Sequence, residues 1–289
     1  MTDASLSPAA FAFDAIAPIF DDRFGGWASV AAQRRAVRAA LLQQFPPMGH
    51  VLEVGGGTGE DAVFLAERGF NVILTDASPA MVDIARQKLS PLGSSAQVVA
   101  GEEMEHFAEE RHAAGEPLLD GAFSNFAPLN CVQDIRSVAK GLASLLKPGA
   151  VAMLVLFGTC CPAEMLVETF RGRPRNAFRR FRRGATPARL AKRNFEVFYH
   201  QASDLRRDFQ PWFELERKIG IGIAVPPSAA EPWISRHPRL LAHMEAFDRA
   251  MASSLSSFGD HVLYQFRRRA WVSHAAMRNT RIEYFEKDR

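Results

Sequence analysis

Residues 52–62, LEVGGGTGEDA, decide the fold, because they have the pattern of a strand that turns through a glycine-rich loop into a helix. Glycines let bare backbone approach a bound cofactor closely. Gly57, Gly59 and Ala62 fit the spacing G-x-G-x-x-A, a tolerated form of the dinucleotide-binding fingerprint. The spacing therefore predicts a cofactor loop but does not identify the cofactor.

Charges beside the glycines distinguish the candidate cofactors. A pyrophosphate would lie on the first backbone N–H groups of the helix, at the positive end of its dipole. Glu60 and Asp61 occupy that first turn, and Glu53 on the preceding strand adds a third negative charge. These charges favour a cationic cofactor and disfavour the alternative, a nicotinamide-dependent oxidoreductase.

Strand and helix patterns alternate on both sides of this loop, which predicts an α/β fold with a parallel sheet. The predicted strands are 50–54, 71–76, 96–101, 119–126 and 150–157, and the predicted helices are 60–69, 78–89 and 132–146. Further along the chain we expect strands at 212–225 and 260–269. A helix at 237–255 would present Leu240, Met244, Phe247, Met251 and Leu255 on one face.

The pattern Glu53-x-Gly55-x-Gly57-x-Gly59 resembles motif I of the class I S-adenosylmethionine-dependent methyltransferases. Asp76, with Ala77 and Met81 after it, resembles the acidic end of the second strand, which binds the ribose. The segments 100–104, 120–132 and 13–24 resemble three further motifs of that family. The resemblance implies S-adenosylmethionine as cofactor. The further cofactor-binding residues that it implies are Glu102 and Glu103 at the adenine, Asn125 and Phe126 at the methionine end, and Phe20 in a closing segment. Arg23 in that segment is a candidate partner of the methionine carboxylate and is equally explained as a solvent-facing residue.

The resemblance also implies a doubly wound, seven-stranded sheet that is mostly parallel, with the last strand antiparallel. We expect five parts along the chain. These are a helical N-terminal cap (1–44), a cofactor-binding core (45–160), an Arg-rich lid inserted after the fifth strand (161–210), strands and a helix that complete the sheet (211–270), and a charged tail (271–289).

Composition limits the setting of the protein. The 289 residues are 47% hydrophobic, enough for one large core, and no apolar run approaches the ~20 residues of a membrane-spanning helix. Three cysteines make no disulfide framework, and the N-terminus lacks the pattern of a secretory signal, so we expect a cytoplasmic protein. No His or Cys cluster has metal-ligand spacing, so no metal is expected.

Residues 171–193 hold nine Arg and one Lys with no Asp or Glu, so this segment carries +10 while the whole chain carries +3. With Phe178 and Phe181 interleaved, it fits RNA binding. It fits equally an anionic small molecule, a membrane surface, or a solvated face of the lid. Because no separate RNA-binding module is visible, nucleic acid is the less favoured partner.

The remaining predictions concern catalysis. Methyl transfer needs no covalent protein nucleophile, only orientation, exclusion of water and, for some acceptors, a base. Candidates near the methyl group are Ser124, Asn130 and Glu164, with Tyr199 and His200 from the lid. Asn130 is equally explained as a turn residue, and a single histidine at the position of His200 is more often structural than catalytic. We expect methylation of an oxygen or nitrogen of a small molecule, anionic or a secondary metabolite, by a monomer or homodimer. An RNA methyltransferase and a non-catalytic, cofactor-binding subunit are the alternatives.

Overall fold

The computed structural model describes residues 6–172 and 177–270, which form a central sheet covered by helices on both faces. The sheet has seven strands in the order β3-β2-β1-β4-β5-β9-β8. Strands β1 to β5 pair in parallel, whereas β9 runs antiparallel to both of its neighbours. The predicted architecture, including the antiparallel last strand, is confirmed.

The central strands of the sheet follow from apolar runs of the sequence, whereas the edge strands β3 and β8 are more polar. The strands are β1 (His50–Val54), β2 (Asn71–Asp76), β3 (Ser95–Val98), β4 (Leu119–Ser124), β5 (Leu146–Phe157), β8 (Phe213–Ile221) and β9 (His261–Arg268). In β5, residues 151–156 are all buried, as expected for a strand covered on both faces.

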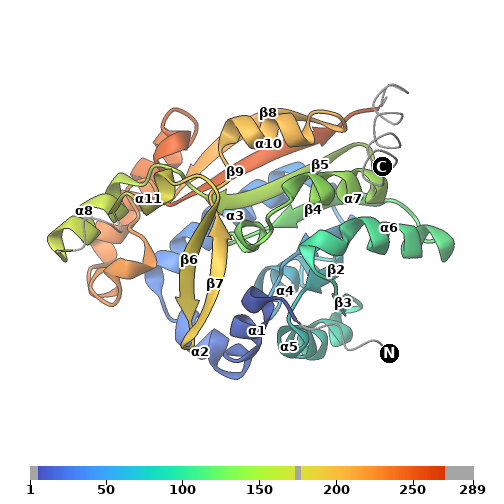
Figure 1. Ribbon diagram of the computed structural model, residues 1–289, viewed down its shortest axis with the longest axis horizontal. Helices are drawn as coiled ribbons and strands as arrows, with labels where there is room; N and C mark the ends of the chain where they lie inside the picture. Colours follow the sequence, from blue (N-terminus) through green and yellow to red (C-terminus); the bar gives the residue numbers. More distant parts are fainter. Residues whose placement is uncertain (1–5, 173–176, 271–289) are drawn as a thin grey trace, which may run out of the picture.

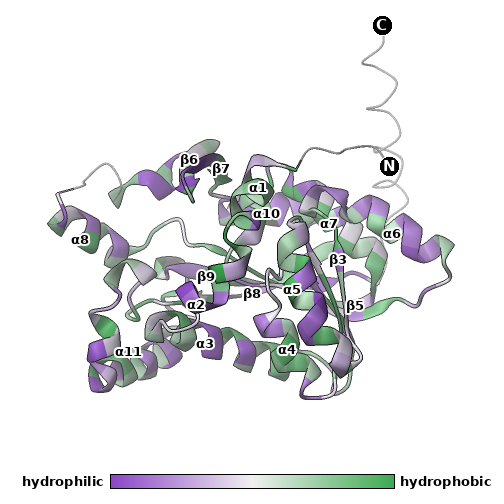
Figure 2. Ribbon diagram, turned by 90° about the horizontal axis from the view of Figure 1, so that it is seen from below, coloured by the Kyte–Doolittle hydropathy of each residue, from purple (hydrophilic) through white to green (hydrophobic). Residues whose placement is uncertain are grey.

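Two hydrophobic clusters lie on opposite faces of the sheet. Figure 2 shows helices on both sides of the strands. One face is covered by α3 (Ala28–Gln44), α4 (Glu60–Ala66) and α5 (Pro79–Leu89). The other is covered by α6 (Met104–Ala113), α7 (Ile135–Leu145) and α10 (Ala202–Phe209). Because both faces are covered, a ligand reaches the sheet at an edge where strands end.

Segments from both ends of the core sequence meet beside the carboxyl ends of the parallel strands. The N-terminal helices α1 (Pro8–Asp14) and α2 (Phe20–Phe24) lie against α5. A hairpin of β6 (Ala185–Leu190) and β7 (Arg193–Phe198) reaches toward them, and β7 packs against α1 (Figure 1). The predicted lid thus contains a two-stranded sheet that its Arg-rich sequence did not indicate.

Two more helices, α8 (Pro162–Phe170) and α11 (Pro238–Met251), lie at the far end of the molecule (Figure 1). The predicted apolar face of α11 is correct only in part: Leu240 and Phe247 are exposed and Leu255 lies beyond the helix, whereas Met244 and Met251 are half-buried. The most buried side chains of the helix are those of Leu241 and Asp248. Asp248 accepts hydrogen bonds from the backbone nitrogens of residues 223–225, and hydrophobic periodicity cannot detect this buried polar anchor.

The predicted tail, residues 271–289, lies outside the described residues, and the predicted boundaries between the five parts stay predictions. Among the helices that the structure describes, none has the length and apolar character needed to cross a membrane.

Candidate cofactor and acceptor site

The glycine-rich loop between β1 and α4 depends on its glycines for two different reasons. Gly55, Gly57 and Gly59 all have positive φ angles, of 71°, 56° and 86°. A Cβ on Gly55 would lie 2.3 Å from Cβ of Pro128, so the glycine permits close packing of the two loops. A Cβ on Gly57 would meet nothing within 4 Å, so open space lies above the loop backbone at this position.

Asp76, at the end of β2, is fixed against this loop by backbone donors. Its carboxylate accepts hydrogen bonds from the backbone nitrogens of Gly57 and Ser78, each at 2.9 Å. Burial raises the pKa of Asp76, and the bonds from Ser78, Gly57 and Ala77 partly oppose that shift. Each carboxylate oxygen keeps acceptor capacity beyond these bonds, as a ribose diol requires.

Glu53 lies under the loop and is 2% exposed. Its Oε2 atom has no hydrogen-bond partner among the described residues. Burial, followed by the negative charge of Asp61, raises the pKa of Glu53 well above its ordinary value. A buried carboxylate with an unpartnered oxygen fits a cationic ligand group, such as the ammonium or sulfonium of S-adenosylmethionine.

The carboxylates at the start of α4 are paired with cations, whereas the sequence-based argument treated them as unpaired. Asp61 is paired with Arg38 at 2.6 Å and Arg34 at 3.2 Å, and Glu60 is paired with Lys88 at 3.0 Å. The cations come from α3 and α5, which local sequence does not reveal. The two carboxylates are therefore largely neutralised, and their supposed repulsion of a pyrophosphate is not a sound basis for choosing the cofactor.

Residues after β4 continue the site. Asn125 is buried and donates from Nδ2 to Asp61 at 2.8 Å, while its Oδ1 accepts from the backbone nitrogen of Phe126. Phe126 has a φ of 58°, and the Arg34 guanidinium lies 4.9 Å from its ring centroid. Ser124 is fully buried, and its hydroxyl has no partner among the described residues.

The remaining cofactor candidates lie around α5 and α6. Glu102 and Glu103 are both exposed, and Glu103 accepts a hydrogen bond from the backbone nitrogen of Ala100 at 2.9 Å, which caps the turn before α6. Contact of either glutamate with adenine stays a prediction.

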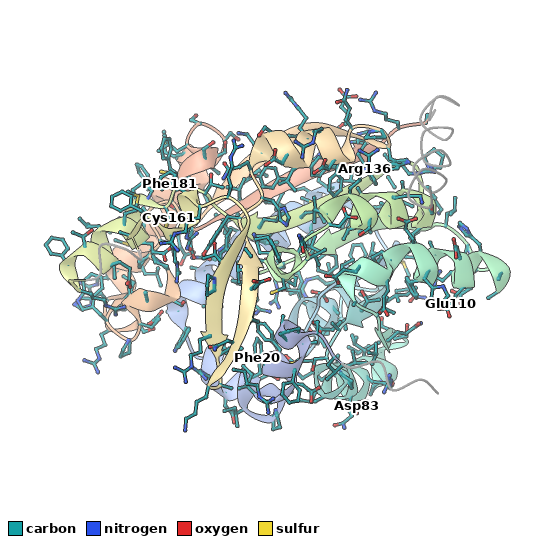
Figure 3. The ribbon with its side chains drawn as sticks, in the orientation of Figure 1. Phe20, Asp83, Glu110, Arg136, Cys161 and Phe181 are labelled. Atoms are coloured by element: carbon teal, nitrogen blue, oxygen red, sulfur yellow. The ribbon has the colours of Figure 1, made fainter. Side chains whose placement is uncertain are left out.

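The closing segment packs on α5 through aromatic side chains. Phe20 and Phe13 pack beside the buried Met81, and the side chain of Phe20 is seen at the lower end of the hairpin (Figure 3). Arg23 is exposed, with its guanidinium 5.2 Å from the ring centroid of Phe24. The roles of Phe20 and Arg23 toward the cofactor therefore stay predictions.

Two predicted catalytic residues connect the lid to the core. Asn130 is fully buried, donates to the carbonyl of Phe198 at 2.6 Å and accepts from the backbone nitrogen of Phe157 at 3.0 Å. His200 Nε2 lies 3.0 Å from the carbonyl of Val132, and burial lowers the pKa of its imidazole. Both side chains are occupied by backbone groups, which gives them a structural contact whatever their part in catalysis.

Tyr199 directly precedes His200 in the chain. Its ring lies beside that of Phe157, with ring centroids 6.0 Å apart. Burial raises the pKa of its phenol, which therefore stays neutral around pH 7. A neutral phenol can donate a hydrogen bond but is not ready to accept a proton. The geometry thus suits Tyr199 for orienting an acceptor rather than for deprotonating it.

One arginine of the Arg-rich segment is inserted into the core. Arg180 is 5% exposed and donates to the carbonyl and carboxylate of Asp260, at 2.5 and 2.6 Å, and to the carbonyl of Gly158. It also pairs with Glu164, which pairs with Arg179. Cys161, Glu164 and Asp260 place possible metal ligands within 4.8 Å of one another, but Arg180 already pairs with both carboxylates. This cluster is therefore an ion-pair network that joins lid and core.

His261 was missed by the sequence analysis. It begins β9 and is 6% exposed, and its ring stacks on Phe157 at 5.0 Å and meets Phe126 edge-on at 5.7 Å. The sequence did contain a signal, because the predicted last strand begins with Asp-His. An antiparallel strand begins at the edge where the parallel strands end, so this pair belongs at the site.

Comparison with known proteins identifies the family. A family model described as a methyltransferase domain matches residues 27–200, more than half of the chain. The chain belongs to the class I S-adenosylmethionine-dependent methyltransferases. This methyltransferase uses S-adenosylmethionine, and the alternatives of a nicotinamide-dependent oxidoreductase and a non-catalytic subunit are set aside.

Relatives of the methyltransferase act on diverse acceptors. The tRNA 5-carboxymethoxyuridine methyltransferase of Escherichia coli (strain K12) is 35% identical over 117 residues, 40% of this chain and 43% of that protein. The magnesium-protoporphyrin O-methyltransferase of Rhodobacter capsulatus is 39% identical over 66 residues, 22% of this chain and 30% of that protein. The aligned part thus spans less than half the length of these curated relatives.

Solved structures support the fold of the methyltransferase alone. A putative S-adenosylmethionine-dependent methyltransferase from Listeria monocytogenes aligns with a TM-score of 0.53 at 16% identity, over 83% of this chain and 99% of that one. The CcbJ methyltransferase from Streptomyces caelestis aligns with a TM-score of 0.55 at 16% identity, over 88% and 96% of the two chains.

Proposed function

We propose that this methyltransferase transfers a methyl group from S-adenosylmethionine to an oxygen or nitrogen of a small molecule. The observation that carries the proposal is the hairpin β6–β7, which is bound to the core at one end and to the N-terminal helices at the other. Phe198 accepts from Asn130, and Phe195 packs on Phe13 with ring centroids 6.0 Å apart. A site bordered by the chain's own segments on two sides favours an acceptor small enough to be enclosed.

The residues of the chain divide the work of binding. S-adenosylmethionine supplies an activated methyl group, so the protein must position the two substrates and exclude water. We assign the ribose to Asp76, the cationic end of the cofactor to Glu53, and the wall next to the methyl group to Asn125 and Phe126. Asn130 and His200 hold the lid, and Tyr199 faces the acceptor.

The Arg-rich segment supports a second candidate acceptor, RNA. Phe178 and Phe181 are about half exposed, with Arg182 and Arg183 exposed beside them, and exposed aromatic rings among cations suit stacked bases. The relative from Escherichia coli is named for a tRNA substrate. Against RNA, Arg180 and Arg179 of the same segment are used in internal ion pairs.

One labelling experiment separates the two acceptors. The protein is incubated with methyl-tritiated S-adenosylmethionine and either total tRNA or the small-molecule fraction of a cell extract, and the labelled product is separated by size. We expect label in the small-molecule fraction, reduced about 10-fold or more in Asp76→Ala at a cofactor concentration below the wild-type Kd. Label that appears in tRNA alone would replace the small-molecule proposal with RNA methylation.

A further inference from the structure

His261 lies where an acceptor would meet the methyl group. It pairs with Phe157, the last residue of β5, and its ring contacts both Phe157 and Phe126. Phe126 is the second residue after the end of β4, next to Asn125. Ligands of doubly wound sheets bind beyond the carboxyl ends of the strands, and these contacts place His261 at that edge.

The hydrogen bonds of His261 define its tautomer. Nδ1 lies 3.1 Å from Oε1 of Gln33 and 3.3 Å from Oδ2 of Asp260, and both are acceptor atoms. The orientation of the Gln33 amide is fixed in turn, because its Nε2 donates to Asp260 at 3.3 Å. Nδ1 therefore carries the hydrogen, and in the neutral ring the lone pair is on Nε2.

The Nε2 atom is free to meet a ligand. Within residues 6–172 and 177–270 no group hydrogen bonds to it, and it is not one of the enclosed, unpartnered side-chain atoms of that part of the chain. His200, by contrast, has its Nε2 bound to a backbone carbonyl. Of these two histidines, His261 presents the free basic nitrogen.

Asp260 keeps its charge in this arrangement. Burial alone would raise the pKa of Asp260, but the charge of His261 when it is protonated, the hydrogen bond from its ring, and Arg180 hold that pKa below its ordinary value. The ionised carboxylate fixes the ring through Nδ1 and stabilises the imidazolium that forms when Nε2 takes up a proton. The Arg180 guanidinium pairs with Asp260 and with Glu164, so the charges around the ring are organised by the lid.

We propose that His261 is the base that takes the proton from the substrate oxygen or nitrogen that is methylated. Gln33 and Asp260 are its positioning residues. This rests on the proposed function. A lone pair of the acceptor oxygen or nitrogen forms the bond to the methyl carbon, and the sulfonium sulfur keeps the electron pair of the bond that breaks. The proton of the acceptor goes to Nε2 of His261 and from there to solvent.

The first test needs no acceptor. In the ¹⁵N NMR spectrum of histidine-labelled protein, His261 is assigned by its loss in His261→Asn, and its tautomer is read at pH 8. Diethyl pyrocarbonate then probes access to Nε2 in wild-type protein by peptide mass spectrometry. We expect the Nδ1–H tautomer and modification of His261. The Nε2–H tautomer, or a ring that resists modification under conditions that modify exposed histidines, overturns the proposal.

The second test uses acceptor acidity as a readout that a structural role would not move. Phenol and 4-nitrophenol serve as probe acceptors at pH 7.5, where phenol retains its proton and 4-nitrophenol is largely ionised. His261→Asn keeps a donor in place of Nδ1 and removes the base. We expect kcat for phenol to fall about 100-fold or more, with a far smaller loss for 4-nitrophenol, and partial recovery of phenol turnover on addition of imidazole.

Control variants separate failure of this inference from failure of the proposed function. His106→Asn, on the exposed face of α6, should leave both rates unchanged. Equal losses for the two phenols in His261→Asn would overturn the role as a base. The proposed small-molecule function would be overturned if wild-type protein labelled tRNA and did not label phenol. In that case the NMR and modification results would still decide the geometry of His261.

Discussion

Glu53 combines two properties that oppose each other, burial and ionisation. Its Oε2 atom has no partner within the described residues, and its pKa is raised first by burial and then by Asp61. A carboxyl group whose pKa is higher in the folded state stabilises the fold at low pH. That contribution is lost as the pH rises through the folded-state pKa, so at neutral to alkaline pH Glu53 costs stability in return for binding.

The variant Glu53→Gln should therefore stabilise the protein without cofactor at pH 8, by about 1–3 kcal/mol, and change it little at pH 5. S-adenosylmethionine should bind about 10- to 100-fold more weakly, because a charge-assisted contact is lost. Urea unfolding at both pH values and calorimetric titration measure the two effects. Glu67→Gln, at the exposed end of α4, is the matched control; a Glu53→Gln protein less stable than wild type at pH 8 would contradict this account.

Individual side chains show where the sequence stops being informative. The glycine loop, Asp76 and Asn125 could be placed from local pattern, because their positions depend on neighbouring residues. The pairing of Asp61 with Arg34 and Arg38, and of His261 with Gln33, joins residues far apart in the chain. Such contacts follow from packing, which a single sequence does not display.

The lid hairpin depends on Asn130 at its core end. Asn130→Ala would leave the Phe198 carbonyl and the Phe157 nitrogen without their partner, at a cost of about 1–3 kcal/mol for each buried group. We expect trypsin to cleave residues 177–193 about 10-fold faster or more, with the affinity for S-adenosylmethionine nearly unchanged. Asn194→Ala, exposed on β7, is the control.

The trypsin result for Asn130→Ala decides whether this contact holds the lid. Cleavage as slow as in Asn194→Ala would show that the hairpin does not depend on it.

The connection between the Arg-rich segment and β9 is also open to test. Arg180→Met would leave Glu164 and Asp260 buried with less compensation, so we expect a loss of about 3–5 kcal/mol in the free energy of unfolding. Arg182→Met, at an exposed position two residues on, should change it by less than about 0.5 kcal/mol. Urea denaturation measures both, and equal stabilities would show that Arg180 is not the anchor.

Whole elements were predicted from the sequence unevenly. The inner strands of the sheet follow from apolar runs of the sequence. Helix α5 follows from the Ser78–Pro79 start signal, and the Ser78 side chain accepts a hydrogen bond from the backbone nitrogen of Met81. The hairpin β6–β7 was not predicted, because its residues are largely exposed or half-exposed and its partners, α1 and Asn130, are distant in the sequence. The face of α11 was predicted only in part for a related reason, since the carboxylate of Asp248 anchors it.

At the scale of the whole molecule, the balance of charge bears on RNA. The Arg-rich segment carries +10, but some of its cations have partners within the protein. We therefore expect no micromolar binding of total tRNA in filter-binding assays, even at about 50 mM salt, where phosphate contacts are strong. Micromolar binding that weakens steeply by about 200 mM salt would instead indicate several phosphate contacts and favour the RNA alternative.

The cofactor site is the central claim, and calorimetric titration with S-adenosylmethionine tests it most directly. Wild-type protein is compared with Asp76→Ala and with Asp83→Ala, an exposed aspartate on α5, and NAD is titrated as the control ligand. We predict binding of S-adenosylmethionine by wild type and Asp83→Ala, about 10-fold or more weaker in Asp76→Ala, and no binding of NAD. Equal binding by all three proteins, or binding of NAD in place of S-adenosylmethionine, would contradict the assignment of this site.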